Sequence, residues 1–375
     1  MSKLIAMCLV VAPLVGACGG SKDTGADTAT DSTTDTTEDT STDTGTDTNT
    51  SSTEVQVRYN WFNPRGGDVP DAWAEGAFES SWPEVYGQTD AVSFYINGVG
   101  EDARGNMTLA FEFLTEHSMA IAVEGGGTLN SEGCDALTGE NSAATELAKI
   151  QTIYDAGGTL SYLSMDGPLS RTLATGRADN CGFDLDTAVT ELVDYVAAIR
   201  LARPEIKIGW AVNFPNWSYD GISSYQCATK DHGDLEVAIE SVLTALAAAG
   251  ESIDYFMADN PYDYATGQKD SNCHDNPAGI DWMGRIVALE NQVVAAGLPF
   301  ALIYNSATGG STSNQMFHDD TVAFVADYQA AGGNPAIRHV ESWYTYPDTL
   351  LPETEDYTLT NTVLDSYRAM TSRWD

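Results

Sequence analysis

The chain alternates short apolar runs with longer segments whose apolar residues recur at helical spacing. The short runs are rich in β-branched and aromatic residues, which favours strands. The longer segments show the i, i+3, i+4 pattern of amphipathic helices. The predicted strands cover residues 55–61, 91–97, 119–123, 159–166, 206–212, 253–258, 300–304 and 336–340. The predicted helices cover residues 107–116, 142–156, 184–203, 234–249, 280–296, 314–331 and 360–371.

Repeated strand–helix units require parallel pairing with right-handed crossovers, and eight such strands close as a barrel. The alternative is an open, doubly wound sheet. Nucleotide-binding folds of that kind carry GxGxxG or a P-loop at a strand–helix turn, and this chain has neither. The sequence therefore predicts a (β/α)8 TIM barrel over residues 54–375.

Six of the predicted strands end on a carboxylate or a carboxamide. In the fourth, Asp166 is followed at once by Gly167 and Pro168, which stop the strand. The carboxyl ends of parallel barrel strands open on one face, where active sites lie. Singly, such an acid also serves as a helix cap or a solvated loop residue, as we expect for Asp102, Asp263 and Glu353. The strand-end residues are Glu124, Asp166, Asn213, Asp259, Asn305 and Glu341.

The first 53 residues do not resemble a folded domain. Residues 1–17 have Lys3, an apolar run and small residues before Cys18, as in a secretory signal. Val15, Gly16, Ala17 and Cys18 resemble a bacterial lipobox, which implies cleavage before Cys18 and lipidation of its thiol; an ordinary signal cut near Ala17 is the alternative. We expect an exported protein, lipid-anchored to the bacterial outer membrane or cell surface through Cys18.

Residues 18–53 are predicted to form a disordered tether. From residue 21 onward they are almost only Asp, Thr, Ser and Gly, with an Asp at every fourth position from Asp23 to Asp47. No side chain there is apolar enough to offset the entropy of ordering. A calcium-binding repeat is the alternative, but it lacks most of the glycines that shape a tight ion loop.

The formal net charge is −38, and the region after the tether is acidic as well, without a basic cluster. Nucleic acid and polyanionic substrates are therefore disfavoured. An uncharged or cationic substrate fits better. No cofactor, metal or oligomer is indicated by the sequence, and we expect a monomer.

Four cysteines lie in the predicted barrel: Cys134, Cys181, Cys227 and Cys273. In an exported protein they favour two disulfides over zinc, since no pair has CxxC spacing and His274 is the only adjacent histidine. Four cysteines allow three pairings. Because they follow strands three, four, five and six, neighbouring loops would join Cys134 to Cys181 and Cys227 to Cys273.

The strand-end acids allow glycosidic cleavage, which needs one protonated and one ionised carboxyl group. Aromatic side chains and amides would bind the sugar rings. Trp210, inside a strand, is expected to be core. The predicted substrate-binding residues are Trp61, Asn213, Trp217, Tyr262, Asn305 and Trp343.

These features resemble the (β/α)8 glycoside hydrolases. The sequence MDGP at 165–168 is similar to their strand-four motif, where Asn-Glu-Pro is usual; here Asp replaces Glu, Met precedes it and Gly167 intervenes. The resemblance to retaining α-glycosidase barrels implies that Asp166 is the nucleophile and Asp259 the acid/base. An alternative pairing makes Asp166 the acid/base and Glu341 the nucleophile, with Glu124 as a further candidate.

Other classes fit less well. The five histidines do not form HxH or HxxE at strand ends, as metal-dependent hydrolases would need, and no GxSxG elbow is present. Phosphodiesterase barrels need catalytic His and basic residues, which are scarce near the strand tips. A non-catalytic carbohydrate-binding surface lipoprotein remains the alternative, because aromatic and amide side chains serve binding as well as cleavage.

Overall fold

Eight parallel strands form a closed barrel within the compact unit Val55–Asp375. A computed structural model describes residues 59–64, 80–99, 106–125, 134–173, 181–223, 232–269 and 279–371. Around the barrel the strand order is β1-β10-β9-β8-β5-β4-β3-β2, and each neighbouring pair is parallel. The predicted (β/α)8 barrel is confirmed. The strands are β1 Tyr59–Phe62, β2 Ala91–Tyr95, β3 Ala120–Gly125, β4 Leu160–Asp166, β5 Lys207–Asn213, β8 Tyr255–Asp259, β9 Phe300–Tyr304 and β10 Ile337–Val340.

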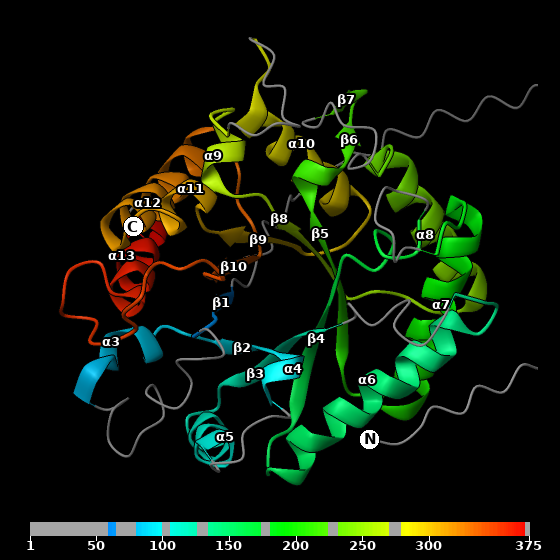
Figure 1. Cartoon of the computed structure of the whole chain (residues 1–375), viewed down its shortest axis with the longest axis horizontal. Coiled ribbons are helices and arrows are strands. Elements are labelled where there is room, and N and C mark those ends of the chain that lie inside the picture. Colours follow the sequence, from blue (N-terminus) through cyan, green and yellow to red (C-terminus); the bar gives the residue numbers. More distant parts are fainter. Residues whose placement is uncertain are drawn as a thin grey trace, which may run out of the picture. The chain divides into compact units, whose positions relative to one another are not determined.

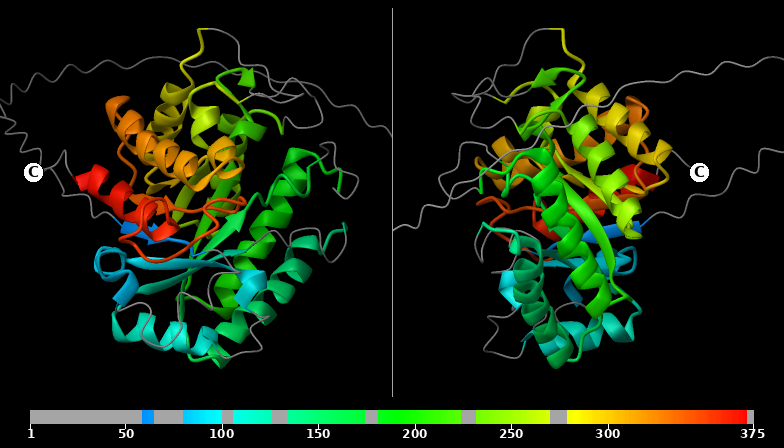
Figure 2. Two further views of the ribbon diagram at one scale, coloured as in Figure 1. Left: turned by 60° about the vertical axis from the view of Figure 1, so that its left-hand side comes forward. Right: turned by 90° about the vertical axis from the view of Figure 1, so that its right-hand side faces the viewer.

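Helices surround the strands (Figure 1), and the turned views in Figure 2 show the same arrangement from the side. Asp184 caps α7 by accepting a hydrogen bond from the Thr187 amide. The helices are α3 Pro83–Tyr86, α4 Ile96–Val99, α5 Asn106–Glu116, α6 Thr138–Asp155, α7 Leu185–Ala202, α8 Leu235–Ala249, α9 Tyr262–Ala265, α10 Trp282–Ala295, α11 Ala307–Gly310, α12 Asn314–Ala330 and α13 Leu359–Thr371, with a 3-10 turn, η1, at Phe214–Asn216.

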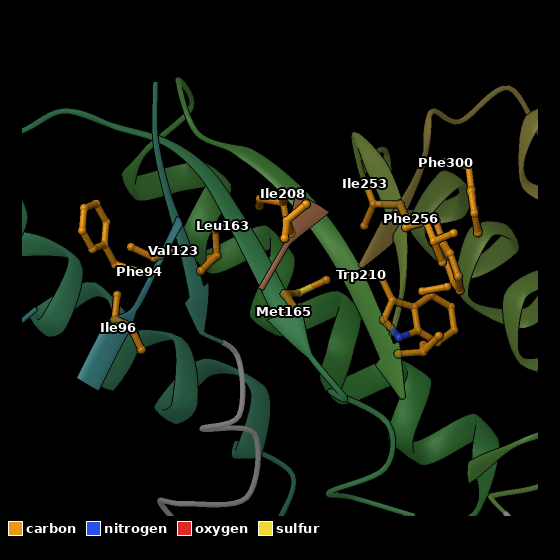
Figure 3. Close-up of a cluster of buried hydrophobic side chains, with 14 of the residues drawn as sticks. Phe94, Ile96, Val123, Leu163, Met165, Ile208, Trp210, Ile253, Phe256 and Phe300 are labelled. Atoms are coloured by element: carbon orange, nitrogen blue, oxygen red, sulfur yellow. The ribbon is translucent and has the colours of Figure 1, made fainter. Parts of the chain in front are cut away.

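The main apolar core lies between the strands and the helices. Alternate side chains of each strand point outward into it, as the period of two requires. Figure 3 shows Val123, Leu163, Ile208 and Phe256 among these side chains. Trp210 is one of them and is 1 % exposed, so its predicted core position is confirmed.

The interior of the barrel is filled by aromatic side chains. Trp61 on β1 packs against Tyr162 and Tyr255, with ring centroids 4.8 and 5.6 Å away. Gly209 makes room for them, since a Cβ atom there would lie 2.1 Å from the Tyr255 ring. Small residues face the same space from other strands: Ala91, Ala122, Ala211 and Ala301. The mouth of the barrel therefore has a closed floor.

Two local features differ from the sequence-based assignment. The second strand was predicted to reach residue 97, but it gives way to α4 at Ile96. A small hairpin, β6 Ser218–Tyr219 and β7 Ile222–Ser223, was missed. Its turn residues, Asp220 and Gly221, both have positive φ, and Asp-Gly is a strong hairpin signal that the sequence did carry.

Several predictions concern residues outside those that the structure describes. They are the signal peptide, the tether, Asp102, Cys18, Cys227 and Cys273.

Candidate active site

The carboxyl ends of all eight strands carry polar side chains that face the barrel axis. On each strand the period of two continues from an interior core residue to the strand end, for example from Trp61 to Asn63 and from Met257 to Asp259. The six predicted strand-end residues are joined by two that sequence reasoning missed. We call the eight side chains the mouth ring: Asn63, Tyr95, Glu124, Asp166, Asn213, Asp259, Asn305 and Glu341.

Asp259 is held by two amides of the mouth ring. The Asn213 Nδ2 atom donates to Oδ2 at 3.1 Å, and Asn305 Nδ2 donates to Oδ1 at 3.3 Å. Strand register explains the first contact, because Asn213 and Asp259 are directly paired. Burial raises the pKa of Asp259 to about 7; the Asn305 hydrogen bond opposes this rise, and the charge of Asp166 adds to it.

Asp166 lies at the open side of the ring, with 42 % of its side chain exposed. Arg171 Nη2 lies 3.3 Å from its Oδ2 atom. Gly167 turns the chain directly after the strand with a φ of 54°, and a Cβ atom there would lie 2.6 Å from Ser170 Oγ. This turn explains the Gly in MDGP and brings Arg171, which sequence reasoning missed, back to the acid.

Glu341 lies at the bottom of the mouth and is fully buried. Its Oε1 atom accepts a 2.7 Å hydrogen bond from Asn63 Nδ2. Burial, opposed by the neighbouring Tyr95 hydroxyl and reinforced by Asp259 and Asp166, raises the pKa of Glu341 to about 8. His339 lies one layer deeper, 3.6 Å from Oε2, and burial lowers its pKa to about 3, so its imidazole is neutral.

Glu124 completes the acids of the mouth ring. Burial and the charges of Glu341, Asp166 and Asp259 raise its pKa well above the ordinary value, while Arg171 acts in the opposite direction. These mutual effects place the four acids in one electrostatic site, as the sequence predicted.

The predicted aromatic residues are divided between the core and the surface. Trp61 is fully buried in the barrel interior, so its predicted role in substrate binding is wrong. Trp217 is 3 % exposed and packs against His232, which leaves no open ring face. The Tyr262 hydroxyl donates a hydrogen bond to Asp327 at 2.7 Å and thereby links α9 to α12.

Two aromatic residues lie beside the mouth ring. Trp343, two residues after Glu341, is 39 % exposed, as its predicted role requires. Its ring contacts Tyr344, with centroids 5.4 Å apart. The predicted site omits Tyr344, yet burial, together with the charge of Asp259, raises the pKa of its hydroxyl. These rings provide an aromatic surface next to the acids.

Two acids predicted to be ordinary loop residues are buried and structural. Asp263 accepts hydrogen bonds from the Ala307 amide at 3.0 Å and the Thr308 hydroxyl at 2.8 Å, and thereby fixes the segment after β9. Glu353 accepts from the Glu84 and Val85 amides at the start of α3. Sequence spacing does not show such contacts, because the partners lie far away along the chain.

The predicted bridge between Cys134 and Cys181 is confirmed, with a Cα–Cα distance of 5.1 Å. It joins the segments that follow β3 and β4. Among the described residues, no three His, Cys, Asp or Glu side chains are grouped to hold a metal ion. In the same part of the chain, no helix has the length and apolar character needed to span a membrane.

Comparison with known proteins adds little beyond the barrel. No family profile and no curated protein matches the chain. Solved structures similar to it include a GH10 endoxylanase from a sugarcane soil metagenome (10 % identity, 83 % of this chain and 97 % of that one, TM-score 0.46). Others are GH5_18 from Streptomyces cattleya with GlcNAc (11 %, 85 % and 82 %, 0.48) and D-allulose 3-epimerase from Methylomonas sp. (11 %, 84 % and 98 %, 0.46). At such TM-scores these similarities carry no argument about function.

Proposed function

We propose that the protein is a glycoside hydrolase that cleaves an extracellular polysaccharide or oligosaccharide. The observation that carries this proposal is the contrast between Asp166 and Asp259. Asp259 is held by two amides and has a pKa raised to about 7 by burial, whereas Asp166 is half-buried and paired with Arg171. Two carboxyl groups in one site with different environments suit an acid and a base.

The proposed roles follow from these environments. Asp259, protonated below about pH 7, donates its proton to the glycosidic oxygen as the C–O bond breaks. Asp166, whose anion is stabilised by Arg171, attacks the anomeric carbon or activates the water that does so. Asn213 and Asn305 orient the Asp259 carboxyl group. Trp343 and Tyr344 offer an aromatic surface for a sugar ring.

Glu341 is the less suitable partner for Asp166. It is fully buried below the ring, and Asn63 and Tyr95 occupy its surroundings. A purely sugar-binding protein is the second candidate, favoured by the exposed ring of Trp343, since such a surface serves binding without any chemistry.

Release of reducing sugar from a panel of glycans tests the proposal on the full chain. We expect Asp166→Asn and Asp259→Asn each to lower kcat/KM by about a thousandfold or more, with unchanged thermal unfolding. Glu240→Gln, on the exposed face of α8, is the charge-matched control and keeps activity. If wild type binds glycans but cleaves none, the protein is a binding module.

We further propose that the protein works outside the cell, anchored through Cys18. The support is the lipobox-like sequence at residues 15–18 alone. Metabolic labelling with a palmitate analogue should mark the wild-type protein, and Cys18→Ser should lose the label and the membrane association. Label retained in the variant would rule the anchor out.

A further inference from the structure

The mouth ring holds more acids than glycosidic cleavage uses. That reaction needs two carboxyl groups, which the proposed function assigns to Asp166 and Asp259. Glu124 and Glu341 remain, on strands β3 and β10. The contacts among the described residues supply these four acids with a single guanidinium, that of Arg171. Within the described part of the chain, the acids of the ring therefore outnumber the basic side chains that contact them.

Two buried acceptor atoms at the mouth accept no short hydrogen bond from the described residues. Glu341 Oε2 and Asn305 Oδ1 accept no hydrogen bond of 3.5 Å or less within the described parts of the chain, although both residues are fully buried; His339 Nε2 lies 3.6 Å from Oε2, and the Tyr95 hydroxyl neighbours the same carboxyl group. Their strands are neighbours: Val340 pairs with Tyr304, so the two residues follow each other in register. A buried acceptor without a donor costs stability, which suggests that a ligand supplies the missing donors.

The charges of the ring favour a cationic donor. Burial, with the charges of Asp259 and Asp166, raises the pKa of Glu341 to about 8; burial and Glu341 raise that of Glu124. Tyr95 and the neutral His339 face the same carboxyl group and bring no positive charge. A cation placed between these acids would relieve their repulsion and favour their ionised forms.

We propose that Glu341 and Asn305, supported by Glu124, bind the ammonium group of an amino sugar, so that the substrate is a cationic glycan with free amino groups. This inference rests on the proposed function, since it names the substrate class of the same site. An ammonium group has three N–H donors, enough for Glu341 Oε2 and Asn305 Oδ1 together. A hydroxyl group has one donor and no charge, and an N-acetyl group removes the charge.

No three His, Cys, Asp or Glu side chains of the described residues are grouped for a metal ion, so we choose an organic cation. Anionic glycans would meet the like charge of the ring and are expected to be the poorest ligands.

Calorimetric titration of the full chain at pH 6 tests the inference with glucosamine, glucose and N-acetylglucosamine, which differ at one substituent. We expect glucosamine to bind about tenfold tighter or better than the other two. Glu341→Gln should abolish that preference and Glu124→Gln should reduce it. Glu240→Gln, which removes the same charge from an exposed helix face, should keep the preference.

The outcomes separate this inference from the proposed hydrolase. Equal binding of the three sugars, or a preference that survives in both Gln variants, would overturn the ammonium site and leave the test of Asp166 and Asp259 untouched. A glucosamine preference that depends on Glu341, without cleavage of any glycan, would support the ammonium site and refute the hydrolase. Thermal unfolding identifies folded variants; if Glu341→Gln does not fold, the Glu124→Gln result decides.

Discussion

At the residue scale, the four acids of the mouth ring are in unequal surroundings. Asp166 is half-buried and has a basic partner, whereas Glu341 is fully buried above the neutral His339. Asp259 lies between these extremes. The Asn213 and Asn305 amides donate hydrogen bonds to its carboxyl group, and they can do so whether that group is neutral or ionised. Burying several acids together makes the protonation of the ring part of the stability of the fold.

The stability of the protein should therefore fall as the pH rises. The folded-state pKa values of Glu341 (about 8) and Asp259 (about 7) lie above their unfolded values, so the folded state binds more protons between about pH 4 and 8. The stabilisation is complete below the unfolded pKa values and is lost as the pH passes 7 to 8. Between pH 5 and pH 9, wild type should lose on the order of 3 kcal/mol more than Glu341→Gln.

Urea unfolding of wild type and Glu341→Gln at both pH values measures this difference. Glu240→Gln is the control, and its pH profile should follow that of wild type because its side chain is exposed. Parallel profiles for wild type and Glu341→Gln would show that the buried carboxyl group does not carry the effect.

At the element scale, the strand ends were predictable from two patterns in the sequence: the short apolar runs of the strands and the helical spacing of apolar residues between them. A strand followed by Gly-Pro, as at Asp166, fixes the end of β4, and barrel topology brings that end to the same face as Asp259. The mouth ring could thus be predicted in large part from apolar runs and the residue that ends each run. Asn63 and Tyr95 escaped because the predicted strand ends, at residues 61 and 97, lie one residue before the true end of β1 and two residues after that of β2.

The depth at which a side chain sits in the barrel was harder to predict than the position of its element. Trp61 and Asn63 differ by two residues on one strand and face the same interior, but one lies in the packed floor and the other in the mouth. The depth at which a side chain sits depends on the stagger of the strands around the barrel, which no local pattern encodes. The same limit applies to Asp263 and Glu353, whose buried partners are supplied by distant segments.

At the scale of the whole molecule, the site is built on the strands and the disulfide braces the segments above it. Glu124 and Asp166 belong to β3 and β4, while Cys134 and Cys181 follow those strands. Residues on a packed strand hold their geometry without help from a loop. We therefore expect the bridge to contribute to stability without holding the acids in place for the proposed chemistry.

Removing the bridge should accordingly lower stability more than activity. The two cysteines are separated by 47 residues, and closing a loop of that length restricts the unfolded chain. The double variant Cys134→Ser/Cys181→Ser should lose about 2–4 kcal/mol of unfolding free energy. At a temperature where it remains folded, it should keep kcat/KM within about threefold of wild type, because the strand ends do not move.

Urea unfolding and glycan hydrolysis of the same preparations measure both quantities. Reduced wild type should match the double variant in stability, which separates the loss of the bridge from any effect of the new side chains. A large fall in kcat/KM in a folded double variant would mean instead that the bridged loops hold the acids in place.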